Sequence, residues 1–112
     1  MIEVIKVINT QFPTRIQNIY SSIFGRTSGY YADESNITFI EKNTIEHPDW
    51  IEENNINSFP TTLFYKDGEL IATRRGILAS QHIIEVIEPY ISFLIFITYN
   101  HISHDTTRTR KN

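Results

Sequence analysis

The sequence predicts an α/β fold in which helices flank a central mixed β-sheet, and its 112 residues suffice for one domain. A β-branched run at Ile2–Ile8, a helix-period segment after it, and two apolar runs joined by Asp67-Gly68 predict this fold. An Asp-Gly pair between such runs is a strong hairpin signal, because a type I′ turn needs positive φ at both central residues. A strand, a helix and a strand before that hairpin predict a parallel pair with a right-handed crossover.

The first strand and helix follow from apolar spacing. Residues 2–8 are apolar at nearly every position, as in an inner strand that is covered on both faces. Pro13 is well placed to open a helix, and the helix is predicted over 15–24 with Gly25 after its last turn. Its predicted buried face, spaced i, i+3, i+4 and i+7, consists of Ile16, Ile19, Tyr20 and Ile23.

The middle of the chain is predicted to alternate loops and short elements. Residues 25–36 are expected to form a loop and 37–40 the second strand. A short helix is predicted over 48–54, because proline at its start fits the first helical position. The hairpin then pairs strands at 61–66 and 69–74.

The last helix of the domain is predicted to begin at Ser80, a good N-cap residue. Its apolar stripe consists of Ile83, Ile84 and Ile87. Pro89 is expected to end it near Glu88, because proline removes a helical hydrogen bond. The predicted element order is therefore β-α-β-α-β-β-α, with residues 1–91 as one domain.

Residues 92–112 are predicted to form a C-terminal extension. Ile91–Tyr99 is an uncharged, β-prone stretch of nine residues, shorter than the roughly 20 that a membrane helix needs. Residues 101–112 have no apolar period and are expected to be disordered. The extension could add an edge strand, mediate self-association through Ile91–Tyr99, or have little consequence.

Composition narrows the function classes. A net charge of −3 without a basic stripe in the body of the chain argues against nucleic-acid binding, and no segment predicts a signal peptide or membrane contact. The absence of cysteine excludes disulfides, thiol nucleophiles and thiolate metal sites. His101-x-x-His104 has a spacing that two metal ligands could use, but its polar surroundings favour a solvated tail. We expect a cytoplasmic protein without a cofactor or metal.

Three short segments carry a resemblance to a known family. Ser58-Phe59-Pro60-Thr61 places a proline directly before a strand, where the ladder does not need its missing N–H. This segment resembles the cis-proline loop of the thioredoxin family, and Lys66-Asp67-Gly68-Glu69 resembles its hairpin turn. Arg75-Gly76-Ile77 resembles the glycine segment beside its substrate groove. The resemblance covers about residues 1–91 and implies a thioredoxin-like sandwich with a cis bond before Pro60.

The same resemblance places the family's active-site tetrapeptide on Thr10-Gln11-Phe12-Pro13. The attacking cysteine then corresponds to Thr10, the resolving cysteine to Pro13, and the buried carboxylate of proton transfer to Val4. Disulfide exchange needs a thiolate, which neither a threonine hydroxyl nor a proline ring supplies. We therefore expect no disulfide oxidoreductase activity.

A surface for a polypeptide remains. In the family's fold the residue before the cis-proline, here Phe59, offers backbone N–H and C=O groups to an extended peptide, and this contact needs no cysteine. The resemblance thus implies a redox-inactive protein that binds a partner protein or peptide. The predicted binding residues are Thr10, Gln11, Phe12, Pro13, Ser58, Phe59, Pro60, Thr61, Arg75, Gly76 and Ile77.

Other interpretations stay open. The chain could be an enzyme that uses glutathione or another small thiol, with Thr10 or Tyr20 stabilising the thiolate. Against this, Thr61-Thr62 follow the proline where such enzymes have an acid and a serine. The chain could also be a structural remnant whose partner contacts lie elsewhere. Phe59 and Trp50 could each belong to the core or line the groove.

Overall fold

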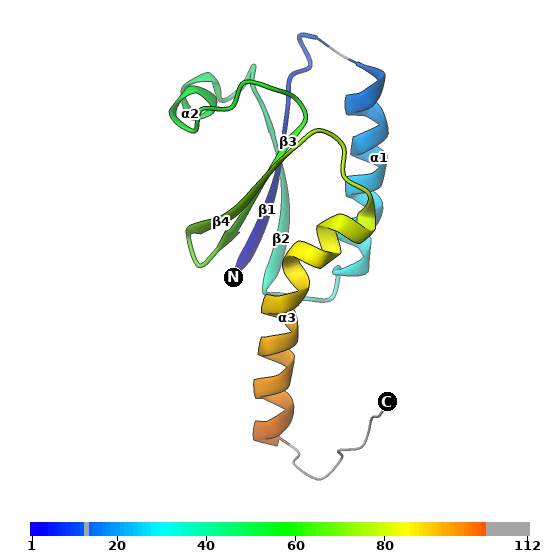
Figure 1. The fold of residues 1–112 in the computed structure, drawn as a ribbon, viewed down its shortest axis with the longest axis vertical. Helices are drawn as coiled ribbons and strands as arrows, with labels where there is room; N and C mark the ends of the chain where they lie inside the picture. The colour runs from blue at the N-terminus through cyan, green and yellow to red at the C-terminus, as the bar shows by residue number, and fades with distance from the viewer. Residues whose placement is uncertain (13, 103–112) are drawn as a thin grey trace.

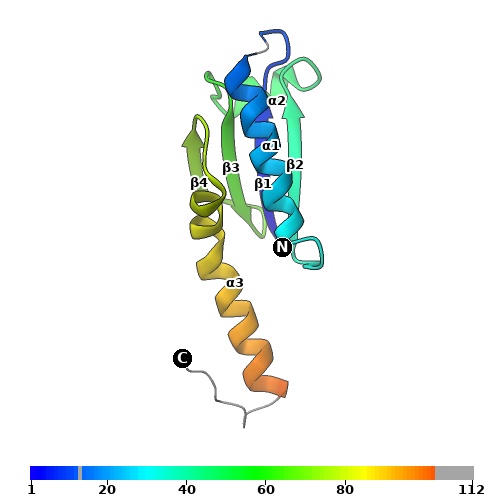
Figure 2. The same ribbon diagram turned by 90° about the vertical axis from the view of Figure 1, so that its right-hand side faces the viewer.

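The computed structural model of the protein describes residues 1–12 and 14–102, and between 92 and 102 it describes the backbone. Within this part of the chain, four strands form one mixed sheet that three helices cover, as Figures 1 and 2 show. The predicted order β-α-β-α-β-β-α is confirmed. The elements are β1 (Ile2–Ile8), α1 (Arg15–Tyr30), β2 (Ile37–Asn43), α2 (Pro48–Glu53), β3 (Thr61–Lys66), β4 (Glu69–Arg75) and α3 (Ser80–Ile102).

The strands lie in the order β2-β1-β3-β4, so the apolar β1 is an inner strand, as its sequence predicts. β1 and β2 are parallel along their full lengths, and α1 connects them. β3 pairs antiparallel with β1 on one side and with β4 on the other. Asp67 and Gly68 have φ angles of 51° and 85°, which are the two positive values that the predicted hairpin turn needs.

Two apolar layers hold the sheet between its helices. α1 and α3 cover one face, and α2 covers the other. The larger buried cluster consists of Ile2, Val4, Tyr20, Phe24, Ile37, Phe64, Leu78, Ile83, Ile87 and Ile91. The smaller cluster, beneath α2, consists of Ile5, Val7, Ile51 and Leu63. The alternation along β1, even positions toward α1 and odd positions toward α2, places the two clusters on opposite faces.

Helix α1 is longer than its glycines predict. The expected end at Phe24 is wrong, because the helix continues through Gly25 to Tyr30. Thr27 is fully buried in the added turns, and its hydroxyl oxygen lies 2.7 Å from that of Ser80 at the start of α3. Packing against α3 therefore outweighs the roughly 1 kcal/mol that a glycine costs inside a helix.

The buried face of α1 is also rotated from the predicted one. Ile16 and Ile19, both expected in the core, are 54% and 43% exposed. Apolar spacing alone missed this rotation because Gln17 is a buried polar residue whose side chain bonds to the preceding loop. The buried positions are Gln17, Tyr20, Phe24 and Thr27.

Helix α3 does not end at Pro89. It continues to Ile102 with Pro89 inside it, so the predicted end near Glu88 is wrong. The prediction that Ile91–Tyr99 is β-prone is wrong as well, because the backbone there is helical. Ile91 continues the buried row of Ile83 and Ile87 at a spacing of four residues, and this packing carries the helix past the proline.

Residues 103–112 lie outside the described residues. They include most of the stretch expected to be disordered, and they include His104 of the His101-x-x-His104 spacing. The division of the chain at residue 91 stays a prediction.

Candidate functional site

The segments that carry the predicted binding residues meet at one end of the sheet, the upper end in Figure 1. The parallel strands β1 and β2 both end there, β4 ends there, and β3 begins there. Residues 9–14, 44–47, 54–60 and 76–79 connect the elements at this place, which we call the loop end. The structure thus brings together three predicted segments, 10–12, 58–61 and 75–77. Pro13 lies outside the described residues.

The loop before β3 is fixed by hydrogen bonds to its backbone. The Phe59–Pro60 peptide bond is cis, the isomer that the resemblance implies. The buried Pro60 accepts a hydrogen bond at its C=O from the Gly76 N–H at 2.8 Å, and this bond joins two of the predicted segments. The Thr61 hydroxyl donates to the Ser58 C=O at 2.7 Å. Gly76 has a φ of 85°, which explains why glycine occupies this turn.

The ring and the backbone of Phe59 lie in different surroundings. Its half-buried side chain packs against the cluster beneath α2, which favours the core interpretation of the ring. Within the described residues, its N–H and C=O form no hydrogen bond. Trp50 packs against the same cluster, so it too is a core residue.

The loop between β1 and α1 is held by Gln17, which sequence reasoning did not single out. The Gln17 Oε1 accepts the Asn9 N–H at 2.7 Å, and its Nε2 donates to the C=O groups of Asn9 and Phe12 at 3.1 and 2.9 Å. Gln17 is 6% exposed, so these bonds satisfy polar groups that water does not reach. Its position three residues before Tyr20, on the buried face of α1, is the sequence signal that could have found it.

Asn43, the last residue of β2, ties Thr10 to the same end of the sheet. Its Nδ2 donates to the Thr10 hydroxyl at 2.8 Å, and its Oδ1 accepts the N–H groups of Thr10 and Ile45 at 3.4 and 3.3 Å. The exposed Thr10 therefore accepts one hydrogen bond at its hydroxyl, and among the described residues its hydroxyl proton has no acceptor.

Exposed apolar side chains surround the loop end. Phe12 is 66% exposed, Ile45 56% and Ile77 41%, and each comes from a different connecting segment. Large apolar side chains grouped at one place on a surface are typical of an interaction site.

The positions that the resemblance assigns to the family's redox residues carry no ionisable group. By that assignment Thr10 stands where the family has a thiol and Val4 where it has a carboxylate, and Val4 is fully buried in the apolar core. Tyr20 is fully buried as well, and its hydroxyl lies 2.7 Å from that of Thr62. Burial raises the pKa of Tyr20 to about 12, and its hydrogen bond to Thr62 acts in the opposite direction. A ligand thiol has no route to this phenol.

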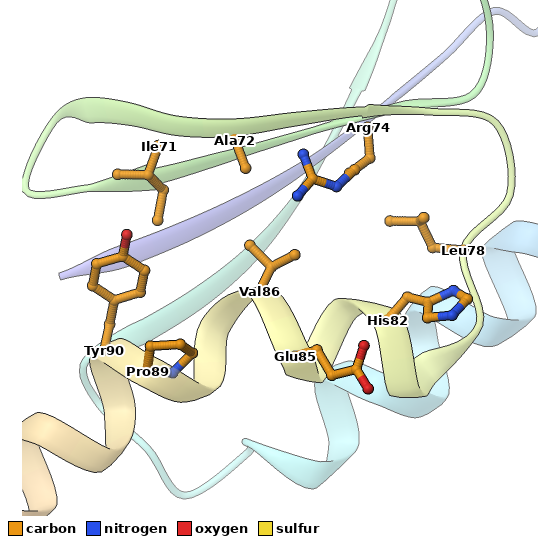
Figure 3. Close-up of a pocket in the computed structure, with 9 residues that line it drawn as sticks. All are labelled: Ile71, Ala72, Arg74, Leu78, His82, Glu85, Val86, Pro89 and Tyr90. Atoms are coloured by element: carbon orange, nitrogen blue, oxygen red, sulfur yellow. The ribbon is translucent and has the colours of Figure 1, made fainter.

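A groove that the sequence analysis did not predict lies between β4 and α3 (Figure 3). Its volume is about 550 Å³. Ile71, Ala72 and Val86 give it an apolar lining, and Arg74 and Glu85 are at its rim. β4 has an irregular register beside Ile71, which brings consecutive side chains to the groove. None of the predicted binding residues lines it.

Metal and membrane features are absent from the described part of the chain. No three His, Asp or Glu side chains of these residues are grouped so that they could hold a metal ion. No helix among them is both long and apolar enough to cross a membrane.

Comparisons with known proteins give the fold. No protein-family model matches the sequence, and no curated protein matches it. Among solved structures it is similar to thioredoxin-2, a component of the malaria parasite protein secretion machinery, with 15% identity over 79% of this chain and 82% of that one and a TM-score of 0.70. It is similar to the thioredoxin of Malassezia sympodialis, with 22% identity over 78% and 73% and a TM-score of 0.65. It is also similar to the oxidised thioredoxin of Plasmodium falciparum, with 21% identity over 80% of this chain and 80% of that one and a TM-score of 0.65.

These likenesses extend over most of the described elements, and they agree with the mixed sheet and the order of elements. The chain therefore has a thioredoxin-like fold, in a sequence that contains no cysteine.

Proposed function

We propose that this protein is a redox-inactive polypeptide-binding module that holds an extended segment of a partner at the loop end. One observation carries the proposal: the N–H and C=O of Phe59, which have no partner among the described residues, lie at the end of the sheet where Phe12, Ile45 and Ile77 are exposed. Unpaired backbone groups supply main-chain hydrogen bonds to an extended peptide, and neighbouring apolar side chains supply specificity.

Rigidity supports the same proposal. The segments that carry these groups are tied by the Gly76–Pro60 hydrogen bond and by the side-chain amides of Gln17 and Asn43. A surface that is ordered before binding loses less conformational entropy when a partner docks. Because no cysteine is present, the fold needs no oxidising compartment, and the cytoplasm is the compartment we propose.

A phage-displayed library of random 12-residue peptides tests the proposal. The immobilised protein should enrich a family of related apolar sequences. The double variant Phe12→Ala, Ile77→Ala should lose at least about tenfold in affinity for them, because each deletion removes apolar contact area. Leu70→Ala is the matched control, since Leu70 is 49% exposed and lies at the opposite end of the sheet.

Enrichment of no sequence family would contradict the proposal, and so would an equal loss of affinity in the Leu70→Ala control. Circular dichroism of each variant shows whether the fold is intact.

A second candidate, an enzyme that uses glutathione or another small thiol, is favoured by the hydroxyl proton of Thr10, which has no acceptor among the described residues. Such a proton could be donated to a thiolate. Glutathione at millimolar concentration should then shift the backbone amide signals of Thr10 and Gln11, and Thr10→Val should abolish the shift. Unchanged spectra eliminate this candidate.

A further inference from the structure

The second half of α3 extends beyond the sheet, at the end opposite the loop end. In Figures 1 and 2 the orange part of this helix runs past the sheet, and none of the other described elements lies beside it. Ile91 is buried in the core, and from there the backbone stays helical to Ile102, a further length of about 16 Å. We call residues 92–102 the projecting segment.

The projecting segment is apolar in sequence. From Pro89 to Ile102 the chain has no Asp, Glu, Lys or Arg. Its large apolar residues are Phe93, Leu94, Ile95, Phe96, Ile97, Tyr99 and Ile102. A helix that is apolar on all sides is typical of a buried helix, so this segment needs a cover.

The groove between β4 and α3 continues into the projecting segment. Its volume is about 550 Å³, and Val86 and Tyr90 of α3 point toward β4 in it, as Figure 3 shows. A spacing of seven residues places positions 93 and 97 on the same face of α3 as Val86 and Tyr90. We call this continuous apolar surface, positions 86, 89, 90, 93, 96 and 97, the outer face of α3.

We propose that a second copy of this chain covers the outer face, with the two α3 helices antiparallel. The projecting segment of each copy then lies in the groove of the other. A two-fold axis that passes between residues 91 and 92, the midpoint of the outer face, covers both surfaces of both copies at once.

The charges of α3 favour the antiparallel direction. Its charged residues are Glu85 and Glu88, and both belong to the first half of the helix. Parallel helices would place each glutamate beside its own copy, whereas antiparallel helices place it beside the uncharged projecting segment. The two Glu85 residues are then roughly 20 Å apart along the helix axes, beyond the screening length of about 8 Å at physiological salt.

The same charges argue against a lipid surface as the cover. Helices that lie on a membrane are rich in Lys and Arg on their polar face. Helix α3 has two glutamates instead, which anionic headgroups repel. No helix in the described part of the chain is long and apolar enough to cross a membrane.

The outer face is large enough for a specific dimer. A phenylalanine buries about 150–250 Å² when it is covered, so Phe93 and Phe96 of two copies contribute roughly 600–1,000 Å². Ile97 and the lining of the groove add to this area. Specific interfaces bury about 1,200–2,000 Å² in total, and the proposed contact reaches that range.

Sedimentation equilibrium of the full chain tests the proposal. The mass should be about 26 kDa, twice the 13.1 kDa of one chain. Pro89→Lys and Phe93→Lys should each raise the dissociation constant of the dimer at least about tenfold, because each places a charge in an apolar contact. Gln81→Lys is the matched control and should leave the constant unchanged. Gln81 is an exposed residue of α3, about 120° around the helix from the centre of the outer face.

Crosslinking tests the direction of the helices. The chain contains no cysteine, so a single introduced cysteine reports its own position. A short bismaleimide should join Val86→Cys to Ile97→Cys when the two variants are mixed, because these positions lie equally far from the axis on opposite sides. Neither variant alone should be joined to itself. Parallel helices would give the reverse pattern on a denaturing gel.

Four outcomes overturn the inference. A monomer of 13.1 kDa at about 100 μM does so. A monomer that sediments with phosphatidylglycerol-containing vesicles does so as well, since lipid would then cover the outer face. The other two are a dimer that Gln81→Lys weakens as much as Pro89→Lys and a dimer in which each cysteine variant is joined to itself. Circular dichroism of each variant shows whether the fold is intact.

Discussion

The β1–α1 loop (residues 9–14) and the Pro60 loop (residues 54–60) adjoin the neighbouring strands β1 and β3 at the loop end. Different kinds of interaction hold the two loops. The Pro60 loop is fixed through backbone groups, by the Gly76 N–H and by the Thr61 hydroxyl on the Ser58 C=O. The β1–α1 loop is fixed by the side chains of Gln17 and Asn43. The chain contains no cysteine, and noncovalent bonds hold this loop.

The comparison shows that this chain has the backbone geometry of the Pro60 loop without any thiol in the β1–α1 loop. The Pro60 loop has the geometry that the resemblance implies, with a cis bond and a glycine at positive φ. The β1–α1 loop contains no thiol, and the side chains of Gln17 and Asn43 hold its conformation. A hydrogen bond between Tyr20 and Thr62 links α1, which follows the β1–α1 loop, to β3, which follows the Pro60 loop.

The largest expected effect comes from the glutamine. Gln17→Leu removes three hydrogen bonds and leaves the buried Asn9 N–H unsatisfied, so the free energy of unfolding should fall by about 3 kcal/mol. Urea unfolding measures the loss. Gln11→Leu is the matched control, because Gln11 is exposed, and it should change stability by less than about 0.5 kcal/mol. Equal effects of the two variants would show that Gln17 does not hold the loop.

Tyr20 gives the next effect, which depends on pH. Its folded-state pKa of about 12 lies above the ordinary value of 10.0, so the folded protein favours the neutral phenol. The stability that this contributes is fully present below pH 10 and is lost as pH rises toward 12. The loss should reach about 2 to 3 kcal/mol.

Tyr20→Phe should lack this part of the alkaline decline, and urea unfolding at pH 9 and 11.5 shows the difference. Burial also raises the pKa values of Tyr31 and Tyr65, which are present in both proteins and so cancel in the comparison. The same decline in both proteins would place the titration elsewhere.

A glycine pair gives a smaller effect with opposite signs. Gly76→Ala should cost about 1 to 2 kcal/mol, because its φ of 85° disfavours a side chain although no atom would clash with the added Cβ. Gly25→Ala should instead stabilise the protein by about 0.5 to 1 kcal/mol, because Gly25 is inside α1 with open space around it. Thermal unfolding distinguishes the two, and shifts of the same sign would contradict this assignment.

The smallest expected effect is none at all. With dithiothreitol as reductant, the protein should not raise the rate of insulin reduction above the rate without protein, because it supplies no thiolate. A thioredoxin in the same assay is the positive control. Turnover above background would mean that another group transfers electrons, and the redox-inactive interpretation would be abandoned.

Sequence reasoning was reliable where local signals and packing agree. Asp67-Gly68 predicted its own turn, and the apolar run 2–8 predicted an inner strand. It failed where packing from distant residues outweighs local preference. Gly25 predicted a helix end, but the contact of Thr27 with Ser80 favours a longer helix. Pro89 predicted a helix end as well, but Ile91 continues the buried row of α3 beyond it.

The site was predicted less completely than the fold. Proline and glycine marked the Pro60 loop and Gly76, because backbone geometry restricts which residues fit there. Gln17 was missed because a glutamine in a helix is usually exposed, and only its three bonds to Asn9 and Phe12 reveal its role. Likewise, the exposure of Ile16 and Ile19 depends on which face α1 turns to the sheet.

Mapping a library-selected peptide by NMR tests the central claim most directly. On titration, the largest changes in backbone amide signals should occur at Phe12, Phe59 and Ile77, because the peptide pairs with the Phe59 backbone between these side chains. If the largest changes occur instead at Val86 and Tyr90, in the groove between β4 and α3, the partner binds elsewhere and the claim that the loop end holds it is contradicted.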